Sequence, residues 1–222
     1  CVTDSGGPLD GTTITLQALD TATCTFTNAD TPARLTLVKE VEAGTTRATE
    51  VPASWTLTAS PDGIVGQGEV SGNGDPTSAG GIAQVEVFAG TYDLAESVIA
   101  GYTAGAWSCT GATVTGAAVS IEPGADVTCT IVNRAQQSTL TLVKDVDNGT
   151  TGGTYEPSDW TLTAAGPTVV SGASGSEAVT SAPVAIGDYV LSEEGPEGYT
   201  ADPWTCTGGT LEGSTVTVPL GA

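Results

Sequence analysis

The segment "LTLVKEV" (Leu35 to Val41) returns almost unchanged as "LTLVKDV" (Leu140 to Val146). Its alternation of aliphatic and polar residues is typical of a β-strand, in which every second side chain lies on the same face. The face that carries the leucines is expected to be buried, and in each copy it also carries a lysine, Lys39 or Lys144. These are the only lysines in the sequence, and a lysine among buried residues requires a chemical partner.

The composition predicts an all-β protein with an acidic surface. The 222 residues include 30 Gly, 12 Pro, no Met and no His, and no long run of helix-forming residues occurs. The net charge of −21 repels nucleic acid and anionic membrane surfaces, so neither is an expected partner. Without His, the Ser-His-Asp and Cys-His arrangements cannot form, and no acidic loop has the spacing of a calcium site. We therefore predict a protein that is not an enzyme and needs no cofactor.

Further matches indicate tandem repeats. The motif "SWTLTA" around Trp55 recurs as "DWTLTA" around Trp160, at the same shift of 105 residues that relates the two lysines. The segment "YDLAESVIAGYTAGAWSCTG", from Tyr92, matches "YVLSEEGPEGYTADPWTCTG", from Tyr189, at a shift of 97. The shift falls from 105 to 97 because the third repeat lacks eight residues around the glycine-rich loop "GNGDPTSAGG". A deletion in a surface loop costs least in stability.

A period near 100 residues is that of whole domains rather than of solenoid units. We predict tandem prealbumin-like (Ig-like) β-sandwiches: the end of one repeat at 1–33, a complete repeat at 34–134, and a third repeat at 139–222 that lacks its last strand. Only six residues join the last matched strand of one repeat to the first strand of the next. Such short joints predict a fixed, extended relation between repeats.

The five cysteines fit the repeats as disulfides. Cys109 and Cys129 bracket a hairpin-like segment, and Cys1 and Cys24 bracket its counterpart, which predicts one bond within each pair. Cys206 has the position of Cys109 in the third repeat and is predicted to stay unpaired. A zinc site is the alternative, but neither a CxxC pair nor His is present, and we predict no metal. Paired cysteines indicate an oxidising compartment.

The same alternation directs more polar residues inward. Glu96 in "YDLAES" and Glu193 in "YVLSEE" share a face with apolar residues, as do Asn133 in "CTIVN" and Asn28 in "CTFTN". Burial lowers a lysine pKa and raises a glutamate pKa, which favours a neutral amine beside a carboxylic acid. Such an amine can attack the asparagine carboxamide while the acid polarises the carbonyl and protonates the departing ammonia. The predicted product is an amide bond between Lys39 and Asn133.

The motif "LxExxxxGY", present as "LAESVIAGY" and "LSEEGPEGY", resembles the E-box of Gram-positive pilins and of Cna B-type, prealbumin-like domains. In that family an early-strand lysine and a last-strand asparagine are joined by an intramolecular isopeptide bond, with the E-box glutamate as catalyst. The resemblance implies these roles for Lys39, Glu96 and Asn133 in the complete repeat. It implies the lysine and glutamate roles for Lys144 and Glu193 in the third repeat.

Two features depart from the family pattern. Val41 and its counterpart in the third repeat stand where Asp often follows the lysine, and paired cysteines are unusual there. A disulfide in place of the isopeptide bond is therefore an alternative, as are a buried Lys39–Glu96 ion pair and a Lys39 that snorkels at the sheet edge. Asn28 is expected to serve a lysine that precedes this sequence, or Lys144 of a neighbouring molecule.

The resemblance implies a mechanical role. We expect the repeats to belong to a stalk, adhesin or pilus-like filament at the cell surface or cell wall of a Gram-positive bacterium, with neighbouring repeats of the same protein and self-assembly into filaments as partners. The alternative is an adhesion module whose loop at 61–81 binds a carbohydrate, a host protein or another cell-wall ligand. The sequence begins at a Cys rather than a Met and has no apolar run of membrane-spanning length, so we expect a segment of a longer secreted protein.

Overall fold

The computed structural model describes residues 1–3, 9–10 and 13–222 and divides the chain into two units, Cys1–Thr31 and Pro32–Ala222. The described strands of the first unit form two pairs: β1 (Val2–Thr3) with β4 (Ala22–Thr23), and β2 (Leu9–Asp10) with β3 (Thr13–Ile14). Residues 24–31 belong to no strand and are exposed to solvent.

The complete repeat is a sandwich of two sheets. The first sheet has, in order, β10 (Tyr102–Ala104), β14 (Asp126–Ala135), β5 (Ala33–Glu42) and β8 (Val85–Val87), and β11 (Ser108–Thr110) also pairs with β14. The second sheet has, in order, β12 (Thr113–Thr115), β13 (Ala118–Ile121), β9 (Gly90–Glu96), β6 (Thr56–Pro61) and β7 (Val70–Asn73). A 3₁₀ turn at Pro52–Ser54 precedes β6.

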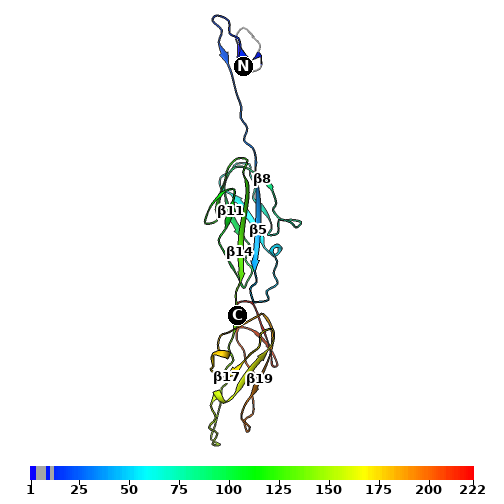
Figure 1. Ribbon diagram of the computed structural model, residues 1–222, viewed down its shortest axis with the longest axis vertical. Helices are drawn as coiled ribbons and strands as arrows, with labels where there is room; N and C mark the ends of the chain where they lie inside the picture. Colours follow the sequence, from blue (N-terminus) through cyan, green and yellow to red (C-terminus); the bar gives the residue numbers. More distant parts are fainter. Residues whose placement is uncertain (4–8, 11–12) are drawn as a thin grey trace. The chain divides into compact units, whose positions relative to one another are not determined.

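The first and last strands of this repeat lie side by side. β5 and β14 run parallel, as Figure 1 shows, and Lys39 lies opposite Ile131 while Val41 lies opposite Asn133. β5 has the predicted alternation: Leu35 and Leu37 are fully buried, whereas Arg34 is exposed and Thr36 and Val38 are half-buried. The inward rows of β5 and β14 therefore face the same core.

The third repeat reproduces one sheet and only part of the other. Its full sheet has, in order, β17 (Val170–Ala173), β16 (Thr161–Ala165), β19 (Gly187–Glu194), β21 (Thr215–Val218) and β20 (Thr210–Glu212), which correspond strand for strand to β7, β6, β9, β13 and β12. Of the other sheet, β15 (Ser138–Leu140) and β18 (Ala182–Val184) form a pair. Short 3₁₀ turns lie at Pro157–Asp159 and Glu177–Val179.

The missing part of that sheet has a simple cause. Residues 199–207, which the repeat shift aligns with β10 and β11, are irregular in the third repeat. In the complete repeat both of these strands pair with β14, and the third repeat has no counterpart of β14 among its described residues. A strand is stabilised by hydrogen bonds to a neighbour, so the segments that depend on that neighbour stay irregular.

Each repeat buries its own core. One cluster is built around residues such as Leu37, Trp55 and Tyr92, and the other around Trp160 and Tyr189. The described residues contain no α-helix, and hence no helix long and apolar enough to cross a membrane. The predicted all-β fold with tandem prealbumin-like sandwiches is confirmed.

The disulfides join the predicted cysteines. Cys109 on β11 lies directly opposite Cys129 on β14, and the two are bonded, as are Cys1 and Cys24. Cys206 is a free thiol. The Cys109–Cys129 bond closes a loop of 20 residues and fixes β14 to the strand at its side.

We predict that Cys109→Ala lowers the free energy of unfolding of the complete repeat by about 3 kcal/mol, because the unfolded chain regains the entropy of the opened loop. The half-buried Cys109 is the better choice for this substitution, because Cys129 is fully buried and its thiol keeps the core filled. Urea unfolding followed by tryptophan fluorescence measures the change.

Cys206→Ala is the matched control, since it removes the equivalent thiol from the third repeat without breaking a bond. Equal unfolding midpoints for the two variants would contradict a stabilising role of the disulfide.

Candidate cross-link site

Three polar side chains, each from a different strand, lie at the core of the complete repeat. Lys39 on β5 and Asn133 on β14 are 2% and 3% exposed. Glu96 ends β9 in the opposite sheet, and its Oε2 lies 2.8 Å from Lys39 Nζ. By the register of the ladder, Asn133 lies one diagonal step from Lys39 on the same inward face. The sheet alternation thus brings together the residues that the sequence singled out.

The hydrogen bonding of this group is incomplete. Lys39 Nζ, Glu96 Oε2 and Asn133 Oδ1 are buried and have no hydrogen-bond partner among the described residues. The 2.8 Å separation of Lys39 and Glu96 is that of an ion pair, but the groups are not aligned as donor and acceptor. A buried polar group without a partner costs about 1–3 kcal/mol. The three side chains are therefore poorly satisfied as separate groups.

The environment of Lys39 shifts its amine toward the neutral form. Burial in the core lowers the pKa of Lys39, and the Glu96 carboxylate, 2.8 Å away, opposes that change without cancelling it. A lower pKa increases the fraction of Lys39 that is unprotonated, which is the nucleophilic form of an amine. A carboxylic acid at Glu96 has one donor and one acceptor, which match the C=O and N–H of an amide.

The walls around Lys39 are an indole ring and a glycine. Lys39 Nζ lies 5.1 Å from the centroid of the Trp55 ring, and Tyr102 packs edge-on against that ring at 5.0 Å. Gly74 accepts a hydrogen bond from the Lys39 amide, and a Cβ at Gly74 would lie 2.3 Å from the Lys39 Cβ. Only glycine fits at this approach. The lysine stem is therefore held on all sides.

The contact between the lysine and the indole ring was not predicted from the sequence, in which the tryptophans served only to mark the repeat. A signal was present: in both repeats the lysine precedes this tryptophan by 16 residues. Lys144 Nζ lies 5.2 Å from the Trp160 ring, so the contact recurs. A cation over an indole face is stabilised by the ring quadrupole, which links each tryptophan to its lysine.

In the third repeat the equivalent lysine and glutamate form a hydrogen-bonded ion pair. Lys144 Nζ lies 3.1 Å and 2.9 Å from the two carboxylate oxygens of Glu193, and the two side chains are 17% and 21% exposed. No asparagine strand is present beside this lysine among the described residues. An ion pair with solvent access is the stable arrangement when the third partner is missing.

The structure bears on two of the hypotheses made from the sequence, one about Lys39 and one about Asn28. The Lys39 side chain is 0% exposed, so the hypothesis that it snorkels at the sheet edge is wrong. Asn28 is exposed in the first unit, whose sequence has no lysine. The cross-link roles of Lys39, Asn133, Lys144 and Asn28 remain predictions, as do the catalytic roles of Glu96 and Glu193.

Comparison with known proteins assigns the family. The model of the SpaA-type prealbumin-like fold domain matches residues 30–131 and again residues 135–222. The chain belongs to this family. Prealbumin-like domains of this type are typically structural, non-enzymatic modules of extracellular surface proteins. Searches of curated proteins and of solved structures found no match.

We predict that the fully reduced chain lacks the mass of one ammonia, because Lys39 and Asn133 are joined by an amide bond. Glu96→Ala is expected to keep the fold but to restore the missing mass, since no acid then lies between amine and carboxamide. Intact-mass spectrometry, followed by a search for the branched peptide, measures both.

Glu193→Ala is the control variant. It removes the equivalent glutamate from the repeat in which the described residues place no asparagine strand beside the lysine, so the mass deficit should persist. A wild-type mass equal to the sum of the residues would mean that Lys39 is only an ion-pair partner of Glu96.

Proposed function

We propose that the protein is a stalk or filament segment of an extracellular bacterial surface protein, in which an isopeptide bond between Lys39 and Asn133 locks the complete repeat. The observation that carries this proposal is a buried lysine and a buried asparagine on the adjacent first and last strands of the domain, with a glutamate of the opposite sheet 2.8 Å from the lysine. Family membership and the two disulfides, which suit an oxidising environment, support it.

The bond forms by a single balanced step. The neutral amine of Lys39 attacks Cγ of Asn133, the new N–C bond replaces the Cγ–Nδ2 bond, and ammonia leaves. Glu96, as a carboxylic acid, hydrogen-bonds to the carbonyl oxygen as charge develops there, protonates the leaving nitrogen, and takes up the proton that the Lys39 nitrogen loses, so that it ends unchanged. The reaction happens once and needs no cofactor. Exclusion of water from the buried site protects the amide afterwards.

The position of the bond gives it a mechanical role. Tension on a stalk enters this repeat at the start of β5 and leaves at the end of β14, because these strands lie next to the neighbouring repeats in sequence. A bond from Lys39 to Asn133 would carry the load across the two adjacent strands. Residues 40–132, which contain most of the core, would then bear no tension. The Cys109–Cys129 bond lies inside this shielded segment.

We predict that Lys39→Ala allows the complete repeat to extend by about 300 Å when the chain is stretched, because residues 40–132 then unravel at ~3.3–3.6 Å each. Reduced wild-type protein is expected to lack this step. Single-molecule stretching under reducing conditions measures the difference.

Lys144→Ala is the matched control, since no asparagine strand lies beside this lysine in the part of the chain that the structure describes, and it should leave the complete repeat inextensible. A 300 Å step in reduced wild-type protein would show that no covalent bond shields the segment.

A further inference from the structure

Two residues, Gln136 and Gln137, link the complete repeat to the third repeat. They lie between the end of β14 at Ala135 and the start of β15 at Ser138. Both repeats belong to one unit of the chain, Pro32–Ala222. A link of two residues keeps the repeats close, but each residue has two rotatable backbone dihedrals, so the link alone does not fix their orientation. Contacts beyond the backbone of the link decide whether the repeats hold one orientation.

The first link residue, Gln136, is hydrogen-bonded to the complete repeat. Its amide donates to Gly101 O at 2.8 Å, and its Nε2 donates to Thr103 Oγ1 at 2.9 Å. Thr103 lies on β10, which pairs with the last residues of β14. The chain therefore leaves the complete repeat in a fixed direction.

The second link residue, Gln137, contacts both repeats. Its Oε1 accepts a hydrogen bond of 3.1 Å from Thr45 Oγ1 in the complete repeat. Its Nε2 donates to Val184 O in the third repeat at 2.6 Å, and also to Ser138 O at 3.1 Å. A carboxamide carries both an acceptor and two donors, so one glutamine can bond to both sides of a joint at the same time. Gln137 therefore bridges the two repeats.

A backbone hydrogen bond joins the repeats a second time. The Ile186 amide, between β18 and β19 of the third repeat, donates to Thr46 O of the complete repeat at 2.9 Å. Thr46 is 3% exposed, so this hydrogen bond is shielded from competing water. The joint thus has one bridge through a side chain and one through the backbone.

The Thr46 carbonyl is held in place by its own turn. The Thr46 hydroxyl donates to Ala43 O at 2.6 Å and accepts from the Ala48 amide at 3.2 Å. Arg47 has a φ of +63°, a left-handed conformation that residues other than glycine rarely adopt and that persists only where the surroundings impose it. This dihedral directly follows the Thr46 carbonyl and helps to set its direction. The turn therefore presents a preformed acceptor.

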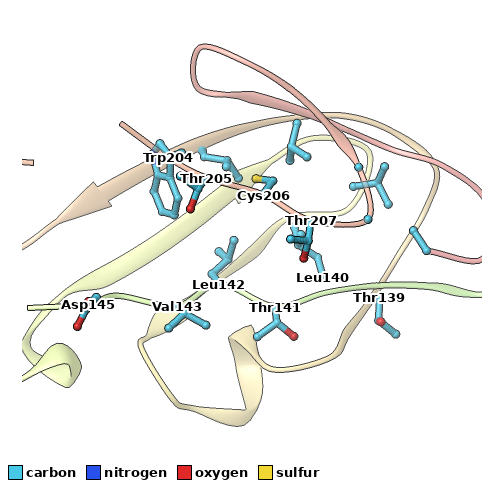
Figure 2. Close-up of a pocket in the computed structure, with 16 residues that line it drawn as sticks. Thr139, Leu140, Thr141, Leu142, Val143, Asp145, Trp204, Thr205, Cys206 and Thr207 are labelled. Atoms are coloured by element: carbon cyan, nitrogen blue, oxygen red, sulfur yellow. The ribbon is translucent and has the colours of Figure 1, made fainter. Parts of the chain in front are cut away.

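The other end of the link is anchored in the third repeat. Ser138 is fully buried, and its hydroxyl donates to Pro219 O at 2.7 Å. Figure 2 shows that the side chains of Leu140 and Leu142, which follow in the chain, are directed toward Cys206. Both leucines pack in the core of the third repeat. A rotation at the link therefore has to move the whole repeat.

We propose that the complete repeat and the third repeat hold a single orientation in solution, and that Gln137 is the residue that fixes it. The receiving surface is the turn 43–47 of the complete repeat, and its partner is the turn 184–186 of the third repeat. The mechanical purpose of this joint rests on the proposed stalk function, because a stalk that bends at its joints spans less distance. The joint itself does not require the Lys39–Asn133 bond.

Charge repulsion is the competing cause of a stiff joint, since the net charge of the chain is −21. The hydrogen bonds of Gln137 and of the Thr46 carbonyl join neutral groups: a hydroxyl, a carboxamide and backbone amides. Salt at about 1 M shortens the range of charge repulsion to roughly 3 Å but leaves hydrogen bonds between neutral groups in place. The proposed joint therefore keeps its orientation at high salt, whereas a joint stiffened by charge loosens.

Residual dipolar couplings of the whole chain, measured by NMR in a neutral aligning medium at low salt and at about 1 M NaCl, test the proposal. One alignment tensor should fit both repeats of the wild type at both salt concentrations, because they move as one body. Gln137→Ala should abolish this common tensor, and Thr45→Val, which removes only the hydroxyl on one side of the bridge, should do the same. Gln137 is exposed and belongs to neither core cluster, so both repeats should stay folded.

Gln84→Ala is the matched control. It removes an exposed carboxamide that bonds only within the complete repeat, to Thr36 Oγ1, and should leave the common tensor unchanged. Wild-type repeats that need two different tensors would overturn the proposal, as would a common tensor that is lost at high salt. A Gln137→Ala variant whose repeats still share one tensor would show that Gln137 does not fix the orientation, and would equally overturn it.

The mass deficit at Lys39 is measured on the same samples by mass spectrometry. A missing isopeptide bond with a common tensor would count against the proposed cross-link alone, whereas a complete bond with two tensors would count against the joint alone. The failure of one is therefore distinguishable from the failure of the other.

Discussion

The parallel ladder between β5 and β14 is the constraint on which the complete repeat depends. It aligns residues from Arg34 to Glu42 with residues 126–134, and β14 in turn holds β10 and β11. The third repeat, whose described residues include no counterpart of β14, shows how the sheet changes without that neighbour. The counterpart of β5 falls from ten residues to three, and the counterparts of β10 and β11 do not form. Local strand propensity is the same in both copies, so the difference lies in the missing hydrogen-bonded neighbour.

The same ladder decides the state of the buried lysine. In the third repeat Lys144 reaches both oxygens of Glu193 and keeps some contact with solvent, so its charge is balanced. In the complete repeat the added strand removes solvent from Lys39 and brings a carboxamide to its side, while hydrogen bonding becomes incomplete. Closing the sheet thus raises the free-energy cost of burying the Lys39–Glu96 ion pair, and the same step brings the Asn133 carboxamide beside Lys39. The proposed cross-link would couple folding to reaction in this way and would account for an inward lysine.

Much of this arrangement could be predicted from the sequence, because period-two alternation assigns each strand residue to a face without knowledge of the partner strand. That rule placed Lys39 and Asn133 inward, and the repeat of the cysteines indicated their pairing. The contact of Lys39 with Trp55 and its close approach to Gly74 were not predicted. Both depend on how loops fold over the sheet, which alternation does not describe. The alternation in "LTLVKDV" also predicted a longer strand than the three-residue β15. The length of this strand depends on a hydrogen-bonded neighbour, and the described residues contain no counterpart of β14 to provide one.

β14 closes its sheet from within its own chain, so the linking residues hold it beside β5 at a high effective concentration. The Cys109–Cys129 bond shortens that link, because it fixes β14 to β11 on one side. The proposed Lys39–Asn133 bond would fix β14 to β5 on its other side. A strand joined covalently to both neighbours cannot leave the sheet without breaking a bond, whereas hydrogen bonds alone allow it to open and close.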